Sequence, residues 1–99
     1  MEEIETMVKV NGVELFLERG IYPVTNQTRL RLFTAEGKPS ITATVAVEHI
    51  ELNSNEVIIK DYSENVGVLK ALKEAEVIDN VTERVKQGFV TLHICDLLI

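Results

Sequence analysis

Hydrophobic and polar residues alternate around the Asn11-Gly12 dipeptide, which predicts an antiparallel β-hairpin. Asn-Gly supplies the two positive-φ residues that a two-residue type I′ turn requires. With that turn, Val10 pairs with Val13 and Lys9 lies opposite Glu14 on the polar face. The same register places one set of apolar residues on a single face: Val8, Val10, Val13, Leu15 and Leu17.

A second hairpin is predicted from residues 29–34 and 40–47, which alternate again on either side of Glu36-Gly37. Between the two hairpins, residues 21–27 lack alternation and contain turn formers, so we expect a connection that crosses to the second hairpin. With Glu36-Gly37 as the turn centre, the register opposes Leu32 with Ile41, Leu30 with Ala43, Arg31 with Thr42, and Arg29 with Thr44.

The middle of the chain predicts a polar loop over residues 48–55, a short strand over 57–60 and an amphipathic helix from Ser63. Asp61 followed three residues later by Glu64 resembles a capping box, and Ser63 is an alternative cap; the sequence leaves both open. A glycine inside a helix costs about 1 kcal/mol relative to alanine. Gly67 therefore suggests close packing of the helix against a strand. The apolar residues spaced at three and four are Val66, Val68, Leu69, Ala71, Leu72 and Ala75.

The last third of the chain predicts two more strands. Asp79-Asn80 breaks the helical pattern, and residues 82–86 fit a short edge strand. Residues 89–95 form a strand that is fairly apolar on both faces, which is typical of a central position in a sheet. We therefore predict a single α+β domain over residues 1–99, an antiparallel sheet built from hairpins with one amphipathic helix packed on it.

Composition and charge narrow the classes of function. With 99 residues the chain is long enough for one core only. Its net charge of −6 repels a phosphate backbone, so we expect no direct binding to nucleic acid. The same negative charge favours binding to a basic surface of another protein. The alternative is that the charge only keeps a small domain soluble.

The compartment is predicted from what the sequence does not contain. Cys95 is the sole cysteine, so an intramolecular disulfide is impossible and a reducing compartment is favoured. Residues 1–5 have neither the basic nor the apolar region of a secretory signal, and no apolar run approaches about 18 residues. We expect a soluble, cytoplasmic protein with no membrane partner.

Candidate catalytic chemistry is sparse. The two histidines are His49 and His93, and His93 lies two residues before Cys95, on the same side of one strand. A zinc site needs at least three protein ligands, so we interpret His93 and Cys95 as packing residues. The sequence has no glycine-rich nucleotide-binding motif and no nucleophile elbow. We predict no catalytic residues, no cofactor and no metal, and therefore not an enzyme.

Acidic residues gather in two places. Glu48, Glu51 and Glu56 flank the predicted long loop, and Asp61 and Glu64 lie at the junction between strand and helix. If the protein uses a negative docking surface, these five residues are the candidates for partner binding. The alternative is that these acidic residues form a solvated rim without a partner. For Asp61 and Glu64, the alternative is that they only cap the helix.

Residues 58–72 (IIKDYSENVGVLKAL), with Gly88-Phe89-Val90 downstream, resemble a group of short, uncharacterised proteins carried by phages and mobile elements of Gram-positive gut bacteria. The resemblance covers about the C-terminal half and carries over no functional residues. It implies a context in which small acidic proteins inhibit a host defence or nucleic-acid-handling protein, as anti-CRISPR inhibitors of CRISPR nucleases do.

Two hypotheses of function follow. The first is a non-catalytic binding module, an inhibitor whose carboxylates engage the basic groove of a nucleic-acid-handling host protein. The second is a structural or assembly protein that associates with itself, for example as a homodimer, through an exposed strand edge, since the chain has several short strands and the apolar end Leu97-Leu98-Ile99.

Overall fold

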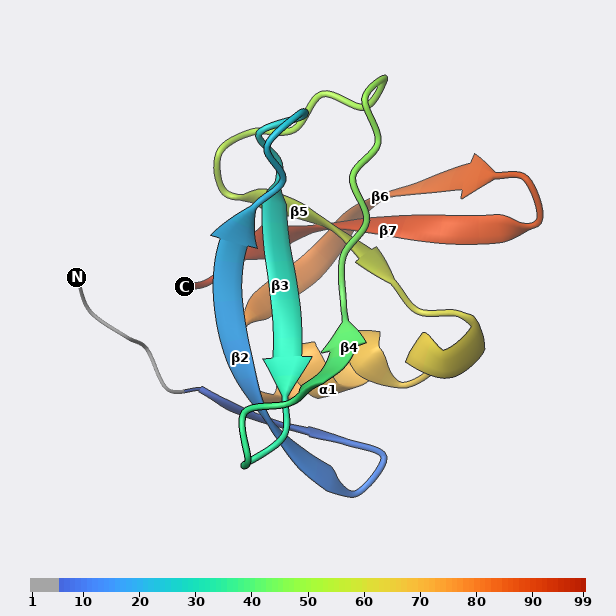
Figure 1. Cartoon of the computed structure of the whole chain (residues 1–99). Helices are drawn as coiled ribbons and strands as arrows, with labels where there is room; N and C mark the ends of the chain where they lie inside the picture. The colour runs from blue at the N-terminus through green and yellow to red at the C-terminus, as the bar shows by residue number, and fades with distance from the viewer. Residues whose placement is uncertain (1–5) are drawn as a thin grey trace.

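The computed structural model describes residues 6–99, and the prediction made from residues 1–5 lies outside this part. The described chain is an α+β domain with two antiparallel sheets, as predicted for the fold class, although we expected one sheet (Figure 1). No helix in this range is long and apolar enough to cross a membrane. The elements are β1 (Met7–Val10), β2 (Val13–Ile21), β3 (Thr28–Phe33), β4 (Pro39–Thr42), β5 (Glu56–Lys60), η1 (Ser63–Asn65), α1 (Val68–Glu74), β6 (Ile78–Gln87) and β7 (Val90–Leu97).

The first sheet has the order β1-β2-β3-β4 and confirms the predicted N-terminal hairpin. Asn11 and Gly12 have φ angles of 49° and 86°, as a type I′ turn requires. Val10 pairs with Val13 and Lys9 with Glu14, which is the predicted register. Val13 is nevertheless 57% exposed, because it lies at the end of the hairpin beyond the core.

Two predictions for the first sheet are wrong in detail. Residues 21–27 do not cross to another hairpin, because β2 pairs directly with β3 and residues 22–27 form the loop between them. The strand predicted over 40–47 ends at Thr42, although the expected pair of Leu32 with Ile41 is present. After Thr42 the backbone leaves the sheet for a different partner.

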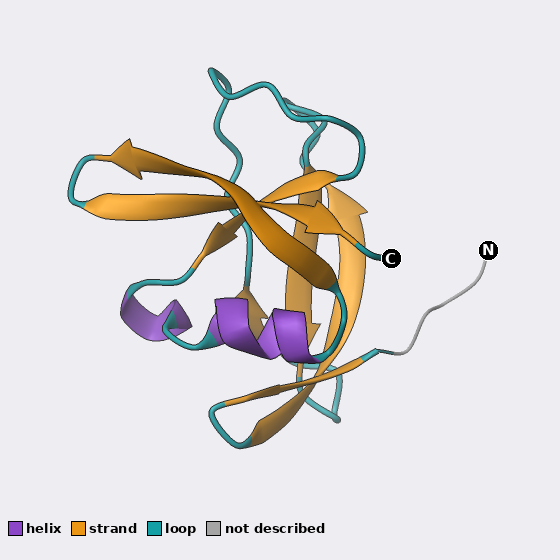
Figure 2. Ribbon diagram, turned by 180° about the vertical axis from the view of Figure 1, so that it is seen from behind, coloured by secondary structure: helices purple, strands orange, loops and turns teal. Residues whose placement is uncertain are grey.

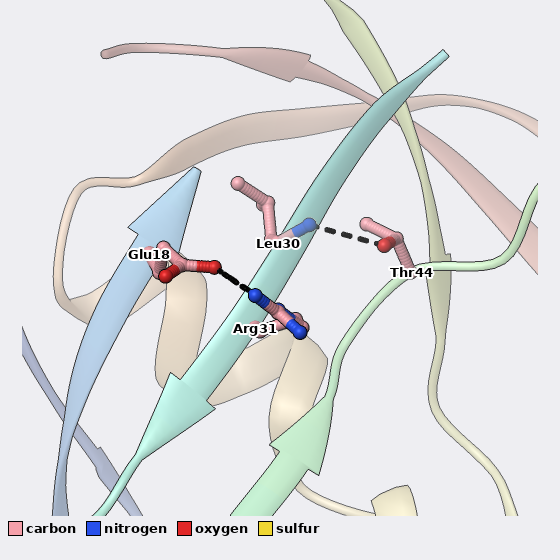
Figure 3. A network of polar contacts seen from close by, with 4 residues as sticks. All are labelled: Glu18, Leu30, Arg31 and Thr44. Atoms are coloured by element: carbon pink, nitrogen blue, oxygen red, sulfur yellow. Dashed lines mark hydrogen bonds and ion pairs between the residues drawn. The ribbon is translucent and has the colours of Figure 1, made fainter. Parts of the chain in front are cut away.

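That partner is the second sheet, and Thr44 marks the crossing point. Thr44 is buried and forms an isolated antiparallel bridge with Ile59 of β5. The hydroxyl of Thr44 accepts a hydrogen bond of 3.1 Å from the backbone N–H of Leu30 in β3 (Figure 3). The N–H of Lys60 donates to the carbonyl of Ala43 at 2.9 Å. Residues 43–45 are therefore a hydrogen-bonded seam between the two sheets.

The second sheet has the order β5-β7-β6, so β7 is central as predicted. Its two faces contribute to two separate clusters of buried residues, Leu92 and Ile94 to one and Cys95 and Leu97 to the other. The edge position of β6 was predicted, but its length was not. Asp79-Asn80 does not interrupt β6, because an irregular register between Ile78 and Val81 accommodates both residues inside the strand.

The helix is shorter than predicted and begins at Val68, because Gly67 before it has a φ of 99° and the predicted start at Ser63 forms a separate 3-10 turn. Helix α1 packs against β1, β5 and β6, between the N-terminal hairpin and the second sheet (Figure 2). The close packing expected at Gly67 is present, but its neighbour is the turn residue Asn11. A Cβ atom on Gly67 would lie 2.6 Å from Oδ1 of Asn11. The helix residues in the core are Val68, Ala71 and Leu72.

Candidate functional site

Two loops form an acidic groove at one end of the molecule. Residues 22–27 and 48–55 lie side by side at the top of Figure 1, and with the start of β5 they enclose about 840 Å³. Three of the five predicted partner-binding residues line this groove: Glu48, Glu51 and Glu56. The structure therefore brings together the carboxylates that the sequence places around the long loop.

The buried side chain of Gln27 holds the longer loop in position. Its Nε2 donates hydrogen bonds to the carbonyls of Val47, at 2.9 Å, and Ile50, at 2.8 Å. Its Oε1 accepts a third hydrogen bond from the N–H of Val47, at 2.9 Å. Because Gln27 belongs to the neighbouring loop, its amide links the two walls of the acidic groove. Gln27 is not among the residues predicted from the sequence, since an amide in a non-periodic segment gives no signal.

The three carboxylates differ in their exposure and in their hydrogen bonds within the chain. Glu48 and Glu51 are exposed, whereas Glu56 is partly buried and its Oε1 accepts a hydrogen bond of 2.9 Å from the N–H of Asn53. Within residues 6–99 the one ion pair joins Arg31 to Glu18, so no basic side chain of this range neutralises the acidic groove. The groove therefore presents three uncompensated negative charges.

Asp61 and Glu64, the other two predicted residues, do not line the acidic groove. Oδ1 of Asp61 accepts hydrogen bonds of 3.0 Å from the N–H groups of Gly67 and Leu69. Asp61 thus caps α1 from outside the helix, and the predicted capping box is wrong in geometry, because α1 begins after Glu64. Neither helical segment receives a side-chain hydrogen bond from its own N-cap residue, and Glu64 is exposed.

The capping role of Asp61 makes a testable prediction. Asp61→Ala should lower the free energy of unfolding by about 1–2 kcal/mol, because two N–H groups at the helix start lose their acceptor. Asp61→Asn keeps an acceptor oxygen and loses only the interaction of charge and helix dipole, about 0.5 kcal/mol. Urea denaturation of both variants, with Ser63→Ala as the control at the other predicted cap, measures the difference. Equal losses for Asp61→Ala and Ser63→Ala would contradict the assignment.

His93 and Cys95 lie in β7 and do not line the acidic groove. Burial raises the pKa of the Cys95 thiol to about 11, so the thiol is protonated at neutral pH. A protonated thiol is a poor nucleophile and a poor metal ligand. No group of three histidine, cysteine, aspartate or glutamate side chains in the described range is arranged to hold a metal ion.

The acidic groove therefore contains three of the five residues predicted for partner binding, Glu48, Glu51 and Glu56. Its walls also carry apolar side chains, of which Val24 is 81% exposed and Ile50 and Leu52 are partly buried. Comparison of the chain with protein-family models, with curated proteins and with solved structures gave no match.

Proposed function

We propose that the chain is a non-catalytic binding module whose acidic groove engages a basic surface of another protein. The observation that supports this proposal is the placement of Glu48, Glu51 and Glu56 along one groove without a neutralising cation from the described residues. A binding surface needs its charges in a fixed arrangement. The three hydrogen bonds of Gln27 supply that arrangement for the loop that carries Glu48 and Glu51.

The charge of the groove favours a particular class of partner. Exposed charges are screened over about 8 Å at physiological ionic strength, so the groove acts mainly on charged groups within about that distance. Clustered Arg and Lys side chains complement it, and such clusters are typical of surfaces that bind a phosphate backbone. A protein that occupies a surface of this kind competes with nucleic acid for it. This supports inhibition of a nucleic-acid-handling protein as the biological role.

The apolar side chains in the same groove provide contact area. Val24 extends into solvent from the 22–27 loop and faces the same groove as Leu52. Interfaces commonly combine a few apolar contacts, which supply affinity, with surrounding charges, which supply orientation and association rate. We expect the aliphatic stems of the partner's basic residues to pack on Val24 and Leu52.

Charge reversal tests the proposal. With an arginine-rich peptide as the probe, Glu48→Lys/Glu51→Lys should weaken binding by about tenfold or more, because attraction becomes repulsion at the contact. Added salt should weaken the wild-type complex in the same direction. Isothermal titration calorimetry at two salt concentrations measures both effects.

Glu74→Lys/Glu83→Lys is the matched control for this experiment. It changes the net charge by the same amount, at exposed residues of α1 and β6 that do not line the acidic groove. We expect this control to retain most of the affinity. If both double variants lose affinity equally, total charge rather than the groove determines binding, and the proposal fails.

The alternative, association through a strand edge, stays a prediction. Of the four edge strands in the two described sheets, β1 and β4 have only four residues each, and β4 begins with Pro39, which has no N–H to donate. Residues 43–45 cover the free edge of β5. Strand β6 is a longer edge, but it carries exposed charged residues and an irregular register. Both features hinder the addition of another strand. The acidic groove is therefore the better-supported contact surface.

A further inference from the structure

A second, larger groove, which we call the arginine groove, lies beside the acidic groove. It encloses about 1420 Å³ along β2 and β3 and is lined by three of the chain's four arginines. Its lining also includes the exposed ring of Phe16 and the partly buried ring of Phe33. The arginines in question are Arg19, Arg29 and Arg31.

The three arginines are satisfied to different degrees. Arg31 forms an ion pair with Glu18 (Figure 3) and its guanidinium carbon lies 5.2 Å from the centre of the Phe33 ring. Arg19 donates a hydrogen bond of 2.8 Å to the main-chain oxygen of Ile99. Arg29 has no acidic partner among residues 6–99, and its buried Nε has no hydrogen-bond acceptor there.

Gly20 explains the position of Arg29. A Cβ atom on Gly20 would lie 2.7 Å from one terminal nitrogen of Arg29, so the guanidinium lies against the backbone of β2 where a side chain is missing. A partly buried, unpaired guanidinium carries a desolvation cost that a carboxylate can offset through two parallel hydrogen bonds. The arginine groove is therefore suited to carboxylates from outside the described chain.

The two grooves meet. Asn26, Thr28 and Ser54 line both of them, so the negative and positive surfaces adjoin. A surface with adjoining patches of opposite sign is complementary to itself under a two-fold rotation whose axis passes between the patches. In that arrangement each acidic groove faces the arginine groove of the other copy, and the contact occurs twice.

We propose that a second copy of this chain occupies these surfaces, with Glu48 and Glu51 of each copy facing Arg19 and Arg29 of the other. The two-fold dimer would also cover exposed apolar residues of both grooves, among them Ile21 at 57% and Val24 at 81% exposure. The inference rests on the proposed function, because the acidic groove is the contact surface both in the dimer and in the complex with a basic partner protein. The dimer hides that groove, so a basic partner protein must displace the second copy in order to bind.

Two reciprocal variants test the dimer by sedimentation equilibrium over a roughly hundredfold range of protein concentration, where a reversible dimer shifts by mass action. Arg19→Glu/Arg29→Glu makes both grooves negative, and Glu48→Arg/Glu51→Arg makes both positive. Each variant alone should dimerise at least about 30-fold more weakly than the wild type, because like charges then face each other at two sites.

An equimolar mixture of the two variants should form a heterodimer, because every contact between them is again complementary. Thermal unfolding followed by circular dichroism confirms that each variant is folded, and Arg29→Gln replaces the arginine variant if that one is not. Arg29→Gln should weaken the wild-type dimer through the loss of the guanidinium. A wild-type protein that is monomeric at every concentration, or a dimer insensitive to both variants, overturns the inference.

Binding of the arginine-rich peptide separates this inference from the proposed function. Arg19→Glu/Arg29→Glu should bind the peptide at least as tightly as the wild type, since its acidic groove is intact and no longer covered. Glu48→Arg/Glu51→Arg should lose both dimer and peptide binding. A monomeric wild type that still binds the peptide through Glu48 and Glu51 removes the dimer alone, whereas a confirmed dimer without peptide binding removes the proposed function alone.

Discussion

Gly67→Ala is expected to lower the free energy of unfolding by about 2–3 kcal/mol, because two costs fall on the same residue. Gly67 has a φ of 99°, a backbone conformation that disfavours any side chain by about 1–2 kcal/mol. The new Cβ would also lie 2.6 Å from Oδ1 of Asn11, which must then move. Movement of Asn11 breaks its hydrogen bond of 2.9 Å to the carbonyl of Val66, worth about 1 kcal/mol.

Gly37→Ala separates these two costs. Gly37 has a φ of 83°, but a Cβ there would meet nothing within 4 Å. We expect a loss of only about 1 kcal/mol, which is the backbone cost by itself. Chemical denaturation of both variants gives the difference. If both glycine variants lose the same stability, the contact of Gly67 with Asn11 contributes nothing and the attachment of α1 to the N-terminal hairpin is misassigned.

Gln27→Ala is expected to cost about 2–4 kcal/mol of stability and to weaken binding of the arginine-rich peptide. Truncation leaves the N–H and carbonyl of Val47 and the carbonyl of Ile50 without their partner in a buried site. The loop that carries Glu48 and Glu51 then loses its attachment to the neighbouring loop. Denaturation and calorimetry on the same preparation measure the two effects.

Gln87→Ala is the matched control, because Gln87 is the same residue type in an exposed position at the end of β6. Surface substitutions of this kind change stability by less than about 0.5 kcal/mol. Peptide affinity should also be unchanged. Destabilisation by Gln27→Ala with full retention of peptide affinity would show that the acidic groove does not depend on its fixed loop.

The parts of the fold that the sequence predicts are those that depend on neighbouring residues. The Asn11-Gly12 turn sets its own register because both residues adopt positive φ angles locally. The central position of β7 follows from apolar residues on both faces, a property of the strand alone. The start of α1 is different. Gly67 adopts a positive φ directly before α1 and lies against Asn11, and local helix periodicity carries no information about a residue so far away in the chain.

The candidate site shows the same division. Glu48, Glu51 and Glu56 are close in sequence, so a single loop is enough to gather them. The arginine groove needs the pairing of β2 with β3, which places Gly20 opposite Arg29. The pattern of residues 21–27 predicts a crossing connection, which does not bring these two strands together. Gln27 was missed for a related reason, since its partners lie in another loop.

The seam at residues 43–45 ties the two sheets to each other through the backbone. Ala43 accepts a hydrogen bond from β5 and donates one to β3, so removal of either sheet leaves buried backbone groups of the other without partners. The larger cluster of buried residues likewise draws on both sheets, with Leu32 from one and Ile59 from the other. A fragment that ends before Glu56 should therefore not persist as a folded half. The two loops of the acidic groove are therefore expected to keep their arrangement only while both sheets are folded.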